Sequence, residues 1–418
     1  MNRCLFKTLG CKTNQYETQL LREQFLENGF SEVDDVNEAD LLIINTCTVT
    51  SNSDKKSERS IRSLIRKNPK ARVIVTGCCV DNPYSRVKDI KDVDLFIANK
   101  DKDKIISYIK DDYVNSIDTI KSFSIRDRAF VKIQDGCNNF CSYCIIPYTR
   151  GKPVSRDLKK IEEEVRNLTK SGYKEIVLTG IHIGLYGYDL GTNLLELIDR
   201  LISIRDLTRL RLSSIDPNEI DRSLIERMKD SDKICRHLHI SIQSGDDRIL
   251  KRMRRRYKTK FLYKLLDYLK KEIPEIGISS DFMVGFPGES DKNFKNTLLL
   301  VKRYDFVKTH IFTYSDREKT ESYNFKNKLS EDIKRERAEI LKEESLKSSM
   351  RFKKSFLTKT LNVLVESRKD KQSYLLGGYT DNYIKTLILD ANVNHINSII
   401  PARIIQIRGN ITYSKIQN

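Results

Sequence analysis

Three cysteines in the middle of the chain are spaced so that one loop could hold a metal cluster with all of them. They are Cys137, Cys141 and Cys144, in the segment GCNNFCSYC. Thiolates at this spacing fit one 4Fe-4S cluster, and because three of the four irons receive a protein ligand, the fourth can chelate a small molecule. A zinc site would need a fourth protein ligand, which no nearby His or Cys supplies. We therefore predict an iron-sulfur cluster in preference to zinc or structural cysteines.

Three further cysteines occupy equivalent places at the ends of predicted strands. Cys11, Cys47 and Cys78 each follow, directly or within two residues, an apolar run that is typical of a buried parallel strand. The carboxyl ends of neighbouring strands in a doubly wound sheet face one crevice, so thiolates far apart in the sequence could meet there. Position alone favours a shared cluster, with three unrelated buried cysteines as the alternative.

The N-terminal part of the chain has the elements to position this second set. Apolar runs predict buried strands at 3–9, 40–46, 72–77 and 93–98, and amphipathic segments predict helices at 16–29 and about 55–67. We expect a doubly wound α/β domain over residues 1–110. Residues 101–125 have a charged, weakly patterned sequence that is typical of a connector.

A second alternation of strands and helices begins at Ala129. Strands are predicted at 129–135, 174–179, 207–213, 237–243, 276–284 and 307–314. Six βα units of this length suit an incomplete parallel barrel, (β/α)6. We place this barrel at 126–350. A charged helix is predicted at 331–354, at its end. Short strands with GG and DN turns then predict a small all-β barrel over 355–417. The predicted fold class is α/β with a small all-β C-terminal domain.

The chain is strongly basic, which favours a polyanionic partner. Lys plus Arg total 76 against 58 Asp plus Glu, a formal net charge of +18. Nucleic acid is the commonest partner of such a protein. The alternative is that the surface is generally basic without binding a polyanion. The segment 251–260, KRMRRRYKTK, is a candidate for phosphate binding. No apolar run has the length of a membrane span and the first residues lack a signal-peptide core, so we expect a cytoplasmic protein.

The CxxxCxxC segment, with the aromatic Tyr143 before its last cysteine, resembles the hallmark of the radical S-adenosylmethionine (SAM) superfamily. The resemblance implies that the open iron binds SAM and that residues at the carboxyl ends of barrel strands contact it. Besides Tyr143, the candidates are Thr179, Gly180, Ser213, Ser214, Gln243, Ser244 and Asp281. Each strand-end candidate has an alternative role as a turn or cap residue.

Nearly the whole chain is similar to the methylthiotransferases, a family within that superfamily. The similarity rests on TLGCKTNQYE, NTCTVT, VTGCC, HLHISIQSGDDRILKRMRRRY and DFMVGFPGE. It implies a second 4Fe-4S cluster on Cys11, Cys47 and Cys78, with Cys79 as the other candidate for the third ligand. The C-terminal VLVES and GGYTDNYIK segments resemble the TRAM domain, a small RNA-binding barrel. Cys4 and Cys235 match no motif and are expected to be buried small residues.

The family resemblance implies a reaction and its partners. Lys12, the following NQYE and TCTVT resemble the branch that adds a methylthio group to C2 of N6-threonylcarbamoyladenosine beside the anticodon of tRNA, position 37. One alternative is the same reaction on N6-isopentenyladenosine, whose branch usually has Gln after the first cysteine. Another is a non-catalytic iron-sulfur RNA-binding redox sensor, which SAM cleavage by the reduced protein would exclude. The resemblance implies tRNA, an electron donor and a sulfur donor as partners, and no membrane.

Overall fold

The computed structural model describes residues 2–114, 117–123 and 127–417. The N-terminal part is a parallel sheet with the order β2 (Ser31–Glu32), β1 (Arg3–Thr8), β3 (Leu41–Thr46), β4 (Arg72–Gly77) and β5 (Leu95–Ile97). Side chains of β3 alternate between its faces: Leu41 and Ile43 pack on the side of α1 (Lys12–Glu27). Leu42 and Ile44 pack on the side of α2 (Ser51–Lys67), where Ile61 and Leu64 meet them as predicted. Helices cover both faces, as the doubly wound prediction requires.

The central part is an open barrel made of two sheets, which are parallel except for one short edge strand. Their orders are β7 (Val154–Ser155), β6 (Ala129–Asp135), β8 (Glu175–Gly180), β9 (Arg209–Leu212), and β10 (Ser214–Ile215), β11 (His237–Gln243), β12 (Gly277–Val284), β13 (Lys308–Thr313). The helices of this part are α4 (Ile146–Arg150), α5 (Leu158–Lys170), α6 (Leu194–Ile202), α7 (Arg222–Asp230), α8 (Asp247–Arg252), α9 (Thr259–Glu272), α10 (Asp291–Arg303) and α11 (Glu331–Lys354). A bridge between Leu210 and Ile234 joins the two sheets. The predicted incomplete barrel is thus confirmed.

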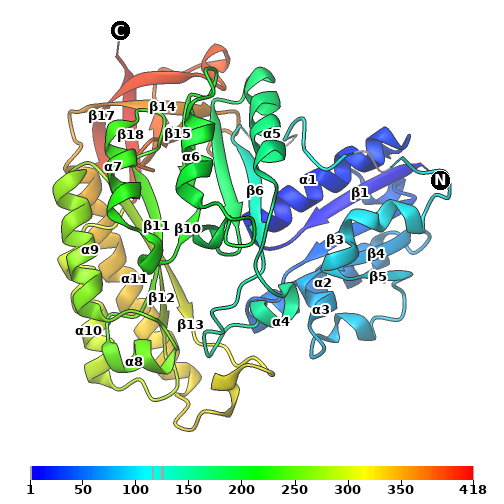
Figure 1. Ribbon diagram of the computed structural model, residues 1–418, viewed down its shortest axis with the longest axis horizontal. Coiled ribbons are helices and arrows are strands. Elements are labelled where there is room, and N and C mark those ends of the chain that lie inside the picture. The colour runs from blue at the N-terminus through cyan, green and yellow to red at the C-terminus, as the bar shows by residue number, and fades with distance from the viewer. Residues whose placement is uncertain (1, 115–116, 124–126, 418) are drawn as a thin grey trace.

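The C-terminal part is a closed five-stranded barrel at the amino ends of the central strands (Figure 1). Its strands are β14 (Thr360–Glu366), β15 (Gly377–Thr380), β16 (Lys385–Ile388), β18 (Ile411–Ile416) and β17 (Ile399–Arg408). The Arg211 guanidinium donates to the backbone carbonyls of Thr380 and Asp381, at 3.0 and 2.8 Å. Tyr383 stacks on His237 with ring centroids 4.3 Å apart. Tyr383 therefore brings the small barrel into the interior of the central one.

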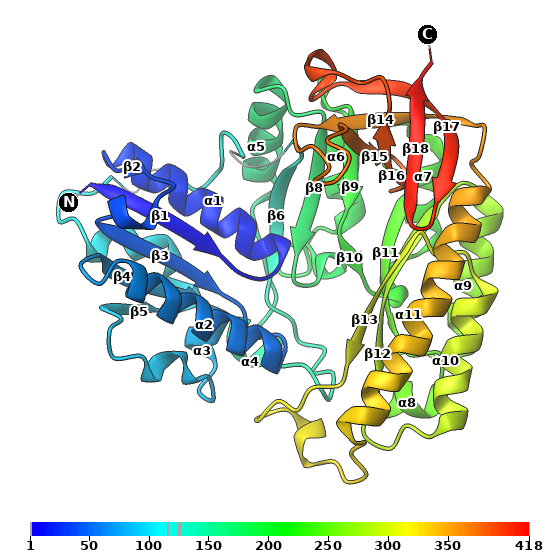
Figure 2. The same cartoon turned by 180° about the vertical axis from the view of Figure 1, so that it is seen from behind.

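Helix α1 lies between the N-terminal sheet and strand β6, and both views show it there (Figures 1 and 2). Its Tyr16 hydroxyl donates to Glu164 of α5, at 2.9 Å. This helix begins at the residue after Cys11, so its packing against the central barrel fixes where the first cysteine points. In the described part of the chain, no helix has both the length and the apolar composition needed to cross a bilayer.

The structure corrects three expectations. The connector predicted at 101–125 is wrong for its first part, because a 3-10 helix at Asn99–Tyr108 buries Ile105 and Ile106 in the N-terminal core. Helix α1 begins at Lys12 rather than at residue 16, and β18 was not predicted. Charged and polar residues dominate these segments, so apolar periodicity does not reveal them. The expected boundary at residue 126 lies outside the described residues.

Candidate iron-sulfur and substrate site

Cys137, Cys141 and Cys144 lie in the loop between β6 and α4, at the carboxyl end of the first barrel strand. Gly136 opens this loop with φ of +72°, and a Cβ there would lie 2.0 Å from the Lys152 carbonyl oxygen, so only glycine fits. Phe140 also has positive φ, 45°. The backbone N–H of Cys144 donates to the Cys141 carbonyl at 2.9 Å. The three thiols are near enough that Cys141 and Cys137 both act electrostatically on Cys144.

Nitrogen groups face the sulfur atoms of this loop. The backbone N–H of Asn139 donates to Cys137 Sγ at 3.5 Å, and Nδ1 of His182 lies 3.5 Å from the same sulfur. Arg255 donates from Nη1 to Cys141 Sγ, also at 3.5 Å. Donors suit electron-rich thiolate sulfurs, whose hydrogen bonds help to set the reduction potential of a cluster. The residues present therefore fit a 4Fe-4S cluster.

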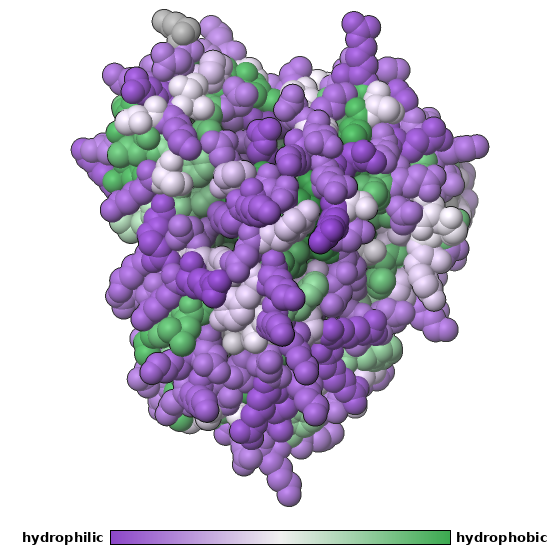
Figure 3. All heavy atoms as spheres, turned by 60° about the vertical axis from the view of Figure 1, so that its left-hand side comes forward, coloured by the Kyte–Doolittle hydropathy of each residue, from purple (hydrophilic) through white to green (hydrophobic). Residues whose placement is uncertain are grey.

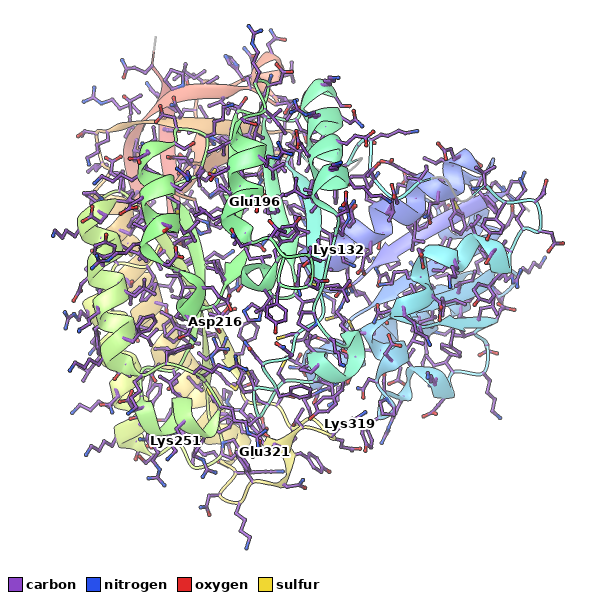
Figure 4. All side chains as sticks on the ribbon, viewed as in Figure 1. Lys132, Glu196, Asp216, Lys251, Lys319 and Glu321 are labelled. Carbon is purple, nitrogen blue, oxygen red and sulfur yellow. The ribbon has the colours of Figure 1, made fainter. Side chains whose placement is uncertain are left out.

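Two of these donors are held by carboxylates. Glu219 Oε1 lies 2.5 Å from His182 Nε2. Burial disfavours a charged His182, but the Cys137 sulfur and Glu219 outweigh burial and raise its pKa to about 9. Arg255 pairs with Asp216 at 2.5 Å and donates to the Tyr257 hydroxyl at 2.9 Å. Figure 4 places Asp216 at the barrel mouth.

The N-terminal cysteines meet at the carboxyl edge of their sheet. The register aligns Thr8 with Asn45 and Thr46 with Gly77, so the strands end side by side. Cys11, the N-cap of α1, is exposed, whereas Cys47 and Cys78 are buried. Gly10 makes the approach possible, because a Cβ there would lie 2.7 Å from the Cβ of Cys47. The thiols are close enough for their charges to interact, and a shared cluster on them stays a prediction.

Arg150, at the end of α4, connects the two cysteine sets. Its Nε donates to Cys78 Sγ at 3.2 Å, and its Nη2 donates to the Asn14 side chain at 2.6 Å. Its Nη1 lies 2.8 Å from Glu17 and 2.9 Å from Asp135. Burial opposes a charge on Glu17, but Arg150, Lys102 and Lys132 outweigh it and hold the pKa of Glu17 well below its usual value. Figure 4 shows Lys132 on the barrel strand that faces α1.

Cys78 and Cys79 have different surroundings. The Cys78 sulfur accepts a hydrogen bond from Arg150, and burial raises the pKa of its thiol while the charge of Arg150 opposes the rise. The Cys79 thiol donates to the Cys47 carbonyl at 3.1 Å and to Asp54 at 3.3 Å. Burial and the Asp54 carboxylate raise the pKa of Cys79 to about 12. A thiol beside a carboxylate and inside the α2-side core is poorly suited to metal binding. Cys4 and Cys235 are buried, as expected.

Four of the SAM-binding candidates lie where barrel strands end. Thr179 and Gly180 end β8, and Ser213 separates β9 from β10. The Ser213 hydroxyl is buried without a hydrogen-bond partner among the described residues, which leaves it available for a ligand. Gln243 ends β11 with φ of 67°, a conformation that non-glycine residues seldom adopt and that often marks a functional position.

The other candidates have protein partners. Tyr143 packs against Phe286 in a small core cluster, with ring centroids 6.4 Å apart. The Ser214 hydroxyl lies 2.7 Å from that of Ser241. Ser244 is fully buried and accepts the backbone N–H of Asp246, so it has the cap role given above as its alternative. Asp281 lies 3.1 Å from His239 on the neighbouring strand.

Asp281, His239 and His310 form a polar group on β11–β13, with one ligand atom from each within 4.8 Å of the others. Burial and the charge of Lys308 lower the pKa of His310 to about 4, so this imidazole is neutral at pH 7. Such a set could ligate a divalent metal. The ammonium charges of Lys12 and Lys308, which act on the same group, oppose a further cation. The group is better suited to hydrogen-bonding an organic ligand.

A cavity of about 560 Å³ begins beside this polar group. Its walls come from β13, α11 and the small barrel and include Lys308, His310, Tyr383 and Lys385. Lys12, from the N-terminal part, reaches the same region. Burial opposes ionisation of the Tyr383 hydroxyl, but the charges of Arg128, Lys12 and Arg211 outweigh burial and lower its pKa. The central and C-terminal parts therefore line one basic cavity, and the charge of Lys12 from the N-terminal part acts on its Tyr383 and His310.

Two described families match this chain: "Radical SAM superfamily" at residues 131–301 and "Uncharacterized protein family UPF0004" at residues 3–98. The protein named "Threonylcarbamoyladenosine tRNA methylthiotransferase MtaB" in Bacillus subtilis (strain 168) is 37% identical over 422 residues, which cover 96% of this chain and 93% of that protein. The chain belongs to the methylthiotransferase family. Another relative, "tRNA-2-methylthio-N(6)-dimethylallyladenosine synthase" of Clostridium tetani (strain Massachusetts / E88), is 33% identical over 422 residues, covering 95% of this chain and 92% of the relative.

A solved structure has the same fold as much of this methylthiotransferase. It is the radical S-adenosylmethionine methyltransferase TsrM from Kitasatospora setae, with cobalamin and a 4Fe-4S cluster bound. The TM-score is 0.55 at 14% identity, and the match covers 75% of each chain. At this identity the likeness concerns the fold alone.

Sequence reasoning missed the side chains that surround the cysteines of this methylthiotransferase. The sequence assigned no role to Arg150 or His182. Arg317 was also missed: it pairs with Asp54 at 2.5 Å and thereby joins the loop after β13 to helix α2 of the N-terminal part. Their partners lie far away in the sequence, so no local pattern indicates these contacts.

Proposed function

We propose that this chain adds a methylthio group to C2 of N6-threonylcarbamoyladenosine at position 37 of tRNA. Segment 1–110 holds one cluster and the sulfur to be transferred, 126–350 binds the other cluster and SAM, and 355–417 contributes to tRNA binding. The observation that carries the proposal is the link from Arg150, six residues after Cys144, to the sulfur of Cys78. A site for radical formation and a site for sulfur delivery then adjoin, as methylthio transfer requires.

The cofactors supply the radical, the methyl group and the sulfur when they are bound. Cys137, Cys141 and Cys144 would hold the cluster that binds SAM, and Cys11, Cys47 and Cys78 would hold the second. Thr179, Gly180, Ser213 and Gln243 lie at the strand ends from which they would position SAM. His182 and Arg255 orient the sulfur atoms through their hydrogen bonds. The protein's own contribution is thus to bind, orient and exclude water.

The polar group of Asp281, His239 and His310, together with the basic cavity that His310 lines, favours the threonylcarbamoyl substituent. That group carries a carboxylate, a hydroxyl and a urea-like unit, which require a cation and hydrogen-bonding groups. Lys12 offers the cation, and Asp281, His239 and His310 offer donors and acceptors. An apolar isopentenyl group would leave these groups without partners, at a cost of about 1–3 kcal/mol each.

The isopentenyl substrate remains the second candidate, because the Clostridium tetani relative is named for the dimethylallyl nucleoside. The polar groups at the cavity argue against this substrate, because an apolar isopentenyl group would leave them without hydrogen-bond partners. A redox sensor without catalysis would have no use for hydrogen-bonding groups at the strand ends. The tRNA substrate also supports a cytoplasmic location, and the reaction needs a sulfur donor and an electron donor.

One experiment distinguishes the roles of the two cysteine sets. A reconstituted Cys141→Ala enzyme should lose about half of its iron and form no 5′-deoxyadenosine. A Cys47→Ala enzyme should cleave SAM yet make no methylthiolated nucleoside. SAM cleavage at the wild-type rate by Cys141→Ala would refute the assignment of the clusters.

A further inference from the structure

A large hollow on the outer surface of the central barrel has no role in the function proposed above. It measures about 1060 Å³ and lies between the 3-10 helix at Pro217–Glu219, α8 and the start of α9. Six exposed basic residues line it: Arg248, Lys251, Arg256, Lys258, Lys260 and Lys264. Figure 4 shows Lys251 on α8, away from the N-terminal part. The hollow therefore concentrates positive charge from the KRMRRRYKTK segment.

These six charges have no carboxylate partner. None of them takes part in an ion pair among the described residues, whereas nearby Arg254 pairs with Glu321 at 2.6 Å. Of the described residues that line the hollow, Asp247 alone is acidic, and its carboxylate accepts the Thr259 N–H at 2.6 Å. Like charges held together raise the local potential and attract anionic partners. The face turned forward in Figure 3 is mainly hydrophilic with small apolar patches, which suits a polar, transient contact.

The hollow reaches the cluster site through a single side chain. Arg255 lines the hollow, and its Nη1 lies 3.5 Å from Cys141 Sγ. Tyr257 also lines the hollow and bonds Arg255 at 2.9 Å. A molecule seated there would contact Arg255, whose guanidinium also contacts Cys141, a proposed ligand of the SAM-binding cluster. Electron transfer benefits from such proximity.

We propose that this hollow docks a small acidic protein that carries one electron. This inference rests on the proposed function, which requires the cluster at Cys137, Cys141 and Cys144 to be reduced. One electron leaves the carrier, which is oxidised by one electron, and enters the cluster; no covalent bond forms or breaks. The unpaired cations steer the carrier by charge complementarity. Phe261, which is 39% exposed, also lines the hollow and adds an aromatic side chain to the contact.

The position of the hollow favours a protein over RNA. Helix α8 lies at the opposite end of the molecule from strands β14–β18 in both ribbon views (Figures 1 and 2). The cavity that includes His310 and Lys385 lies on the side of those strands. A tRNA bound there and at the small barrel leaves α8 free. The carrier and the tRNA can then bind at the same time.

A charge-reversal variant tests the proposal. Lys251→Glu, Arg256→Glu and Lys260→Glu are combined in the reconstituted holoenzyme, and reduced flavodoxin, a small acidic flavoprotein, is the probe. The dissociation constant is measured at several salt concentrations, and cluster reduction is followed by electron paramagnetic resonance. Affinity and reduction rate should fall by roughly tenfold or more, with a weaker salt dependence. A matched control reverses Lys159, Lys170 and Lys174, which lie on the exposed surface of α5 and the turn after it, and should behave as wild type.

Dithionite, which needs no docking, distinguishes this proposal from the proposed function. With dithionite, the charge-reversed enzyme should cleave SAM at the wild-type rate and bind tRNA with unchanged affinity. Wild-type reduction by flavodoxin in the variant would overturn the proposal, and so would a loss of tRNA affinity with unchanged reduction, because the hollow would then be an RNA surface. A failure of the wild type to make methylthiolated nucleoside with dithionite would refute the proposed function and leave the docking measurement intact.

Discussion

The Nε atom of Arg150 lies 3.2 Å from the Sγ atom of Cys78, although 72 residues separate them. The same guanidinium is almost completely buried and pairs with Glu17 of α1 and Asp135 of β6. One side chain thus joins the N-terminal sheet, the first helix and the barrel at the point where the two cysteine sets approach. The relative position of these sets depends on a buried ionic network.

Replacing Arg150 by Met should destabilise the protein by about 3–5 kcal/mol, because Glu17 and Asp135 lose a buried partner. Arg150→Lys keeps the charge but cannot bond Cys78, Asn14 and both carboxylates at once. This variant should therefore lose stability too, but less than Arg150→Met. Urea denaturation of the two variants measures the difference. Equal stability of Arg150→Met and wild type would show that Lys102 and Lys132 alone satisfy the carboxylates.

Cys79→Ala should retain the N-terminal cluster, whereas Cys78→Ala should lose it. The reason is that the Cys79 thiol donates to Asp54 and to the Cys47 carbonyl, while the Cys78 sulfur faces Arg150. Iron analysis and the visible absorption of reconstituted enzyme measure the outcome. Retention of iron by Cys78→Ala with loss in Cys79→Ala would reverse the choice of ligand.

Lys12→Gln should lower kcat/KM for tRNA with the threonylcarbamoyl group by roughly 10- to 100-fold, because a hydrogen bond to a charged group contributes about 1.5–3 kcal/mol. Lys12→Arg should recover part of the loss, and Lys67→Gln on exposed α2 should have no effect. Iron content and 5′-deoxyadenosine formation must be unchanged, which separates substrate recognition from damage to the adjacent Cys11. An equal loss with tRNA that lacks the threonylcarbamoyl group would contradict this role.

Glu175 should stabilise the fold above pH 4.5 and lose this effect as the pH falls. Burial opposes its charge, but Arg211, at 2.6 Å, and then Arg128 and Arg209 outweigh burial and lower its pKa from 4.5 to about 2. Its folded pKa lies below the unfolded value, so the stabilisation is full above 4.5 and declines toward about 2.

The test of Glu175 compares Glu175→Gln with wild type by urea denaturation between pH 7 and pH 3. The variant should be less stable by about 3 kcal/mol at pH 7, since three arginines lose a buried partner, and the gap should narrow below pH 4.5. Glu343→Gln, on the exposed face of α11, is the control and should not change stability measurably. A gap that does not depend on pH would contradict the assignment.

The fold could be predicted because its strands are short apolar runs separated by clear turns. The order of the central barrel follows from such runs alone, whereas the 3-10 helix at Asn99–Tyr108 and strand β18 are too polar to show the pattern. The cysteine sets could be predicted because spacing and strand ends are local properties. Arg150, His182 and Arg255 could not, because their partners are distant in the sequence.

The run Arg254–Arg256 is another place where the sequence did not show which partners the side chains meet. Segment 251–260, which contains this run, was predicted to bind phosphate, but the three arginines separate in the structure. Arg255 is turned inward to Cys141 and Asp216, Arg254 pairs with Glu321, and Arg256 is exposed without an ion pair among the described residues. A linear run of charge says nothing about which side chains turn inward. Phosphate binding by segment 251–260 stays a prediction for its exposed basic residues Lys251, Arg256, Lys258 and Lys260, and the hollow that they line has a different proposed partner.

The central claim is tested most directly by competition between two tRNA substrates. The reconstituted enzyme receives equal amounts of tRNA with N6-threonylcarbamoyladenosine and tRNA with N6-isopentenyladenosine at position 37, with SAM and a sulfur source. Mass spectrometry of the nucleosides measures both methylthiolated products. The account predicts product on the threonylcarbamoyl tRNA in large excess, with 5′-deoxyadenosine formed in parallel. Preferred turnover of the isopentenylated tRNA would contradict it.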